Sequence, residues 1–290
     1  MKRLIALAAT LAALTTACAE TGAQPLGPAP GNGSASPSST GTTTPSPSAS
    51  PDPTRSMTYE LWFNYDGSLF VTHRTEPFTP AVGGRALEAL LEGPTDAQRD
   101  ARVGTSINAG TGLLDLTIDD GVATVDLEDT FSAEETPAIA VGSLSQIVYT
   151  LTQFDSVQGV VFEVEGEPLT NFGGYELDGA LRRTNFADQL PFILVESPGI
   201  GERVSSPVTI AGTSDVFEAV VSIEILDQNG DTIASTFTMA TCGTGCRGSY
   251  TTDVRYDVGT RQPGTIRVYE VSAMDGSQIH IVEIPVVLTP

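Results

Sequence analysis

One long stretch near the amino terminus cannot take part in a packed fold. From about residue 22 to residue 56 the chain consists almost entirely of Pro, Ser, Thr, Gly and Ala. Such a segment cannot bury enough apolar surface to offset the entropy that is lost when it orders. We therefore expect a disordered tether over residues 18–56, with folding confined to the residues after it. A flexible chain of this length reaches roughly 30 Å, and about 100 Å in a fully polyproline-like form.

Residues 1–17 have the pattern of an export signal, with a short basic start, an apolar run over 4–14 and small residues before Cys18. The run is too short to span a bilayer. The segment resembles the lipobox of bacterial lipoproteins, although Leu14 lies four residues before the cysteine instead of three. The resemblance implies acyl chains such as palmitate on Cys18, and a place on the extracytoplasmic face of the cell membrane. The alternative is an ordinary secretory signal with an unrelated cysteine.

The two remaining cysteines, Cys242 and Cys246, stand close together in the sequence. A zinc site would need further thiolate or imidazole ligands, and the chain offers only His73 and His280. We expect a disulfide, which is the usual state of such a pair in an oxidising compartment. Because the loop is small, it contributes only about 2 kcal/mol. No metal site and no cofactor is expected.

The net charge is strongly negative, −22 at neutral pH. Nucleic acid and anionic lipid headgroups would both be repelled by such a surface, and no cluster of Lys or Arg offers a local exception. We therefore expect no nucleic-acid partner. The expected membrane contact is the lipid anchor at Cys18.

Residues 57–187 mix two kinds of periodicity. Alternating runs indicate strands, and apolar residues three and four apart indicate helices. The expected strands are 58–63 and 69–71, joined as a hairpin at Asp66-Gly67, then 113–118 and 122–127, joined at the turn Asp119-Asp120-Gly121, and 159–165. The expected helices are 82–92 and one that begins with a capping box at Ser132 and Glu135. The mixture predicts an α/β or α+β domain.

This region resembles the GerMN domain of spore-germination proteins and bacterial, especially actinobacterial, lipoproteins. The matching segments are LEALLEGPT at 87–95, GVATVDLEDTF at 121–131, QIVYTLTQFDSV at 146–157 and VFEVEG at 161–166. Glu128 departs from the family, which tends to have a small hydroxyl residue there. The resemblance implies no catalytic residue.

Residues 191–290 change to short β-like runs separated by turn residues, which predicts an all-β sandwich. The runs are 192–196, 204–211, 219–226, 232–239, 248–256, 265–272 and 278–288. The region resembles the immunoglobulin-like domain that accompanies GerMN. The matching residues include Ser197-Pro198, Gly212, Phe217-Glu218-Ala219 and Asp275-Gly276-Ser277.

Several acidic pairs could serve in calcium binding or as the acid and base of a glycosidase, with Asp119 and Asp126 the residues to test. A solvated surface explains them more simply, as for Glu163 and Glu165 on the polar side of a strand. The literal G-x-G-x-x-G at 243–248 is followed by a β-run, so we interpret it as a tight loop and not as a nucleotide site. No catalytic residue is expected.

An aromatic-rich run opens the GerMN-like region. Core packing is the usual role of such residues, and the alternative is that Trp62 or Tyr65 lines a platform for glycan or peptide. Together these features predict a lipid-anchored, non-enzymatic protein that binds a cell-envelope protein or wall polymer. The alternatives are a carboxylate-based hydrolase of wall glycan or peptide, and a lipoprotein that binds calcium or a small ligand.

Overall fold

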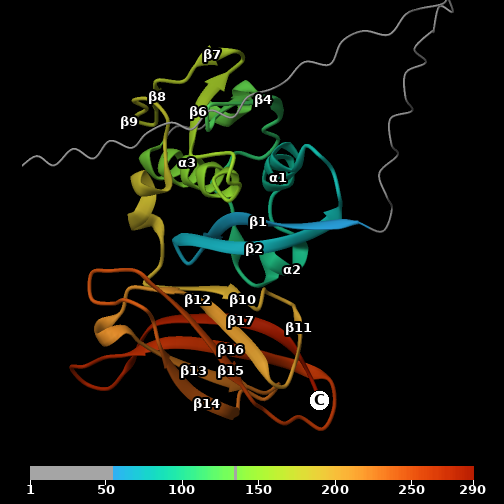
Figure 1. The fold of residues 1–290 in the computed structure, drawn as a ribbon, viewed down its shortest axis with the longest axis vertical. Helices are drawn as coiled ribbons and strands as arrows, with labels where there is room; N and C mark the ends of the chain where they lie inside the picture. The colour runs from blue at the N-terminus through green and yellow to red at the C-terminus, as the bar shows by residue number, and fades with distance from the viewer. Residues whose placement is uncertain (1–54, 134–135) are drawn as a thin grey trace, which may run out of the picture. The chain divides into compact units, whose positions relative to one another are not determined.

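The computed structural model describes residues 55–133 and 136–290 (Figure 1). The expected export signal, the expected lipidation site at Cys18 and residues 18–54 of the expected tether lie outside these residues. Ser56, at the end of the expected tether, is the first residue of β1. Within the described part of the chain, no helix is both long and apolar enough to cross a lipid bilayer.

The first domain alternates strands and helices, as its mixed periodicity predicts. Its strands are β1 (Ser56–Tyr65), β2 (Ser68–Pro77), β3 (Val103–Gly104), β4 (Leu113–Asp119), β5 (Val122–Leu127), β6 (Gly159–Val164), β7 (Glu167–Pro168), β8 (Asn171–Phe172) and β9 (Tyr175–Glu176). Its helices are α1 (Val82–Leu91), α2 (Asp96–Asp100) and α3 (Pro137–Leu151), with 3₁₀ turns η1 (Asp129–Ser132) and η2 (Arg183–Gln189). The mixed fold class is therefore confirmed.

Helices α1 and α3 form the middle layer of this domain. A sheet of order β2-β1-β3 lies on one side of them, and a sheet of order β4-β5-β6-β7 lies on the other (Figure 1). Since α3 contacts both layers, it is buried on nearly every side, from Gly142 through Leu151. A helix with apolar residues on one face only would bury its polar face in that position.

Two-residue turns fix the register of both hairpins in this domain. Asp66 and Gly67 have φ of 50° and 83°, and they join β1 to β2 so that Tyr65 lies opposite Ser68. Asp120 and Gly121 have φ of 46° and 82° and join β4 to β5. Positive φ at both positions matches the twist of the strands, and an Asp-Gly pair adopts it readily. Both hairpin predictions are confirmed.

The predicted capping box at the start of α3 is wrong. Thr136 is the N-cap, its side chain accepts a hydrogen bond from the Ile139 N–H at 3.3 Å, and Pro137 occupies the first helical turn. Ser132 ends the preceding 3₁₀ turn, and Glu135 lies outside the described residues. Proline needs no N–H partner at a helix start, so it begins the helix four residues later than we predicted.

The second domain is a β-sandwich, as predicted. Its strands are β10 (Ile193–Ser197), β11 (Arg203–Ser205), β12 (Val208–Ser214), β13 (Val220–Leu226), β14 (Thr232–Met239), β15 (Gly248–Val254), β16 (Gln262–Val271) and β17 (Gln278–Thr289), with the 3₁₀ turn η3 (Phe217–Ala219). One sheet has the order β10-β12-β15 and the other the order β11-β17-β16-β13-β14. Inward-facing residues of both sheets, such as Ile210 and Ile266, form the core.

The single strand expected over 204–211 is in fact two strands in different sheets. Strand β11 pairs in parallel with β17, whereas β12 pairs with β10 and β15. Pro207 lies between them and has no N–H to donate to a ladder, so the run is interrupted there.

Candidate functional site

The aromatic residues proposed as a ligand platform lie in different surroundings. Trp62 is only 3% exposed, its ring lies 4.7 Å from that of Tyr149, and the guanidinium of Arg183 lies 5.4 Å from it. Tyr65 is half-buried at the end of β1, where it contacts Phe70 and the Arg102 guanidinium. The structure therefore gives Trp62 a packing role, because a platform needs an exposed ring.

Helix α3 satisfies the open edge of β1 with side chains, which the sequence analysis did not foresee. Thr150 accepts a hydrogen bond from the Trp62 N–H at 3.1 Å, and Gln146 donates to the Trp62 carbonyl at 3.0 Å. Gln153, two residues after the end of α3, accepts a hydrogen bond from the Glu60 N–H at 2.7 Å and donates one to the Glu60 carbonyl at 2.8 Å. Gln146, Thr150 and Gln153 follow one another at intervals of four and three residues. This spacing is the only sequence signal for their role, and it is equally typical of a polar helix face that is exposed to solvent. Here that face is buried, and it takes the place of a neighbouring strand.

Strand β4 is exposed along most of its length. Five of its seven residues are exposed, among them Leu114 at 46% and Ile118 at 44%. It is the terminal strand of its sheet, so one of its edges has no neighbour in the described part of the chain. Long exposed edge strands pair readily with another chain, and proteins usually cover or blunt them.

An apolar groove of about 340 Å³ lies between β4 and the start of α1. Leu116 and Ile118 line one side, and Phe154 with the glycines Gly83 and Gly84 lines the other. A Cβ atom added to Gly83 would lie 3.9 Å from both Leu116 and Phe154. The absence of a side chain at this position therefore leaves the groove open.

The outer face of the same sheet carries a row of carboxylates. Asp115 lies opposite Asp126 in the antiparallel pair, and Asp126 lies beside Glu163 in the parallel pair. Neighbouring side chains in such rows are about 5 Å apart, and like charges there repel one another. Among the described residues none of the three forms an ion pair, and the chain's only lysine is Lys2. The row is therefore an uncompensated anionic surface.

The carboxylates beside β2 and α1 have very different surroundings. Arg85 donates to Glu76 at 2.8 Å and 2.9 Å, and to Glu92 at 3.0 Å. The hydrogen bonds from Arg85 to the Glu76 carboxylate lower the pKa of Glu76 from 4.5 to about 2. Burial and the hydrogen bond to Glu76 raise the pKa of Tyr59 to about 12. This cluster holds β2 to α1, and its carboxylates are paired with arginine within the domain.

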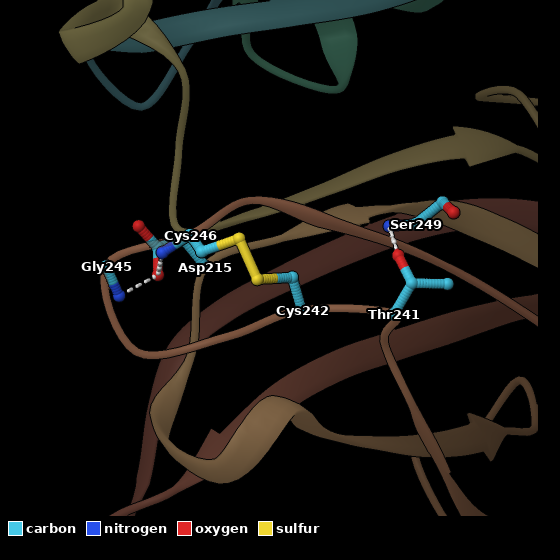
Figure 2. Close-up of a disulfide and its surroundings, with 6 residues drawn as sticks. All are labelled: Asp215, Thr241, Cys242, Gly245, Cys246 and Ser249. Carbon is cyan, nitrogen blue, oxygen red and sulfur yellow. Dashed lines mark hydrogen bonds between the residues drawn. A yellow bond between two sulfur atoms is a disulfide. The ribbon is translucent and has the colours of Figure 1, made fainter. Parts of the chain in front are cut away.

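The predicted disulfide between Cys242 and Cys246 is confirmed (Figure 2). The Asp215 carboxylate accepts hydrogen bonds from the N–H groups of Gly245 and Cys246, at 2.7 Å and 3.1 Å. The G-x-G-x-x-G loop therefore directs its amides at a carboxylate of its own domain. Gly248 leads directly into β15, as the tight-loop interpretation requires.

The two carboxylates named for hydrolysis do not form a pair. Asp119 on β4 lies opposite Val122 on β5, and Val122 lies four residues before Asp126 on that strand. That offset separates the two by about 13 Å along the sheet, beyond the carboxyl spacings of glycosidases. In the described residues, no group of three or more His, Cys, Asp or Glu side chains is arranged to hold a metal ion.

The two folded regions match two family models. Residues 62–170 match the Germane family, described as "Sporulation and spore germination". Residues 192–277 match the Gmad2 family, described as "Immunoglobulin-like domain of bacterial spore germination". The chain carries a Germane domain followed by a Gmad2 domain. The resemblance of the two regions to a GerMN domain and to its accompanying immunoglobulin-like domain is thereby confirmed. Strand β4, with its groove and carboxylate row, belongs to the Germane domain.

Two solved structures from Bacillus subtilis are similar to this chain. The first GerMN domain of the sporulation protein GerM is 22% identical, with a TM-score of 0.36, and the match covers 44% of this chain and 98% of that one. The tandem GerMN domains of the same protein are 15% identical, with a TM-score of 0.40, and the match covers 81% of this chain and 61% of that one. These likenesses are too weak to assign a role to any residue. No curated protein matches this chain.

Proposed function

We propose that this protein is a lipid-anchored, extracytoplasmic binding protein of the bacterial cell envelope and not an enzyme. Cys18 would carry the acyl chains, residues 18–56 would act as a tether, and the Germane and Gmad2 domains would be held away from the membrane. The proposal takes its setting from the lipobox-like segment and from the family descriptions, both of which concern bacterial envelope or spore proteins.

The observation that carries the binding role is the uncovered strand β4. An apolar groove lies on its inner side and uncompensated carboxylates lie on its outer side, whereas the other acidic cluster of the domain is neutralised by Arg85. Solvent-exposed apolar groups beside charged ones are typical of a recognition surface. The favoured partner is a protein of the envelope, with a wall polymer as the alternative.

The anchor is tested by fractionating the native host and measuring the mass of the amino-terminal peptide. We expect the wild type in the membrane fraction with a diacylated or triacylated Cys18, and the variant Cys18→Ser released from it. An unmodified chain that keeps Met1 and stays in the cytosol would refute the proposal.

The binding role is tested by crosslinking intact cells that make either the wild type or a variant with a blocked groove, Ile118→Lys. Ile118 is 44% exposed, so lysine can be accommodated without unfolding the domain. We expect discrete crosslinked partners that are lost in the variant. A crosslinking pattern no different from that of an unrelated tethered protein would argue against a binding role.

A further inference from the structure

The backbone of β4 has a defined set of unused hydrogen-bonding groups. The two-residue turn makes Asp119 and Val122 a directly bonded pair, so bonding alternates from there along the hairpin. Leu116 and Ile118 therefore direct their N–H and C=O groups away from β5. Within the described residues, no loop or side chain forms hydrogen bonds with these four groups. The edge is open along Leu116–Asp119, and the bulge at Leu114 limits it at the other end.

The side chains of an added strand would meet two contrasting surfaces. On its inner side they would continue the groove formed by Leu116, Ile118 and Phe154, where no lining residue is charged. On its outer side they would lie beside Asp115, Thr117 and Asp119. Successive residues of a strand point to opposite faces, so the best fit alternates apolar and cationic side chains.

Most charges at the turn end of the groove are also negative. The Gln158 N–H donates to the Gly121 carbonyl at 2.7 Å, which places the exposed Asp155 loop next to the β4–β5 turn that contains Asp120. The one cation in this hydrogen-bond network is Arg182, whose guanidinium donates to the Gln158 carbonyl at 3.4 Å. The edge is thus bordered mainly by carboxylates, which disfavour an acidic partner, including a second copy of this chain.

We propose that β4 receives an extended, cationic segment of a partner protein, which adds to its free edge as a further strand. Alternate apolar side chains of that segment enter the groove, and its Lys or Arg side chains lie beside Asp115 and Asp119. Main-chain hydrogen bonds supply affinity in this mode of recognition, and the alternating side chains supply specificity. The inference rests on the proposed function in that it names the partner for its binding surface.

The probe is the alternating peptide (Lys-Val)₄, added to the full-length protein in a non-ionic detergent. The controls are Lys₄Val₄, which has the same composition in blocks, and (Glu-Val)₄, which has the opposite charge. Two further analogues of the probe carry N-methyl groups at the odd or at the even positions. We expect (Lys-Val)₄ to give the amides of Leu116 and Ile118 at least tenfold protection from hydrogen exchange, and Lys₄Val₄ and (Glu-Val)₄ to give none. One N-methylated analogue should bind like the parent and the other about tenfold more weakly, because only one set of N–H groups faces β4.

Three variants separate the contributions of charge and groove. The double variant Asp115→Asn, Asp119→Asn should weaken the peptide about tenfold and keep the fold, because it relieves repulsion within the carboxylate row. Ile118→Lys should abolish binding. Gly83→Leu should do the same by filling the groove from the other side, because a Cβ at this position lies 3.9 Å from Leu116 and Phe154.

Three results would overturn the inference. Equal binding of (Lys-Val)₄ and Lys₄Val₄ would mean attraction by charge without strand addition. Equal binding of both N-methylated analogues would exclude backbone pairing. Protection of Leu116 and Ile118 that rises with protein concentration in the absence of peptide would assign the edge to a second copy. If the peptide fails and cells still give discrete crosslinked partners, the binding role stands and only the addition of a cationic strand to β4 falls.

Discussion

Gln146 provides the most direct test of how α3 is held against β1. It is fully buried in the middle of an apolar helix, where leucine of similar volume would fit. Its amide group donates to the Trp62 carbonyl at 3.0 Å, and its carbonyl accepts from the Ser106 N–H at 2.8 Å. We expect Gln146→Leu to destabilise the domain, even though the change increases buried apolar area.

The size of the change in unfolding free energy depends on the backbone groups that lose their hydrogen-bond partners. A buried backbone donor or acceptor without a partner costs about 1–3 kcal/mol, and Gln146→Leu leaves two of them. The leucine side chain returns about 1–2 kcal/mol through burial. The two groups together cost about 2–6 kcal/mol, so the expected net loss of unfolding free energy is about 0–5 kcal/mol, centred on about 2–3 kcal/mol. A count of buried apolar area alone gives the opposite sign.

Urea unfolding followed by tryptophan fluorescence measures this change at the relevant place, since Trp62 is the only tryptophan of the chain. The matched control is Gln158→Leu, at an exposed position of the same domain, which should change the unfolding free energy by less than about 0.5 kcal/mol. If Gln146→Leu unfolded at the same or a higher urea concentration than the wild type, the reasoning about the β1 edge would be refuted.

Three further changes test other parts of the fold. Because Arg85 lowers the pKa of Glu76 to about 2, the stability from this carboxylate is full above pH 4.5 and is lost as the pH falls toward 2. Glu76→Gln should flatten that part of a melting-temperature profile, and an unchanged acid slope would contradict the assignment. Replacing both Cys242 and Cys246 by serine should cost about 2 kcal/mol in denaturant unfolding, because the loop is small, and loss of folding would show a larger role. Gly212→Ala should lower the melting temperature severely, since its Cβ would lie 2.0 Å from the Leu194 carbonyl oxygen, and a melt within a degree or two of wild type would contradict this close approach.

Features that depend on neighbours in the chain could be predicted from the sequence. The Asp66-Gly67 and Asp120-Gly121 turns are examples, because both residues of each pair can adopt positive φ without help from the rest of the fold. The helix over 82–92 and the composition change that separates the tether from the domains are similarly local. The family resemblance added the order of the two domains, which the family models confirm.

Local pattern failed where the outcome depended on distant partners. Gln146 looks like one polar residue on a helix, and only the packing of α3 against the open edge of β1 gives it two backbone groups to satisfy. The run over 204–211 has strand character throughout, but its two halves join different sheets on either side of Pro207.

The acidic charge and the separate folded regions could be recognised in the sequence, because composition and short-range periodicity determine them. The open edge of β4 could not. Asp115 and Asp126 face each other across the β4–β5 hairpin, but Glu163 joins them only because α3 returns the chain to form β6 in parallel beside β5. Whether an acidic strand is covered or exposed is likewise settled by which elements pack over it, and only the tertiary structure leaves β4 open.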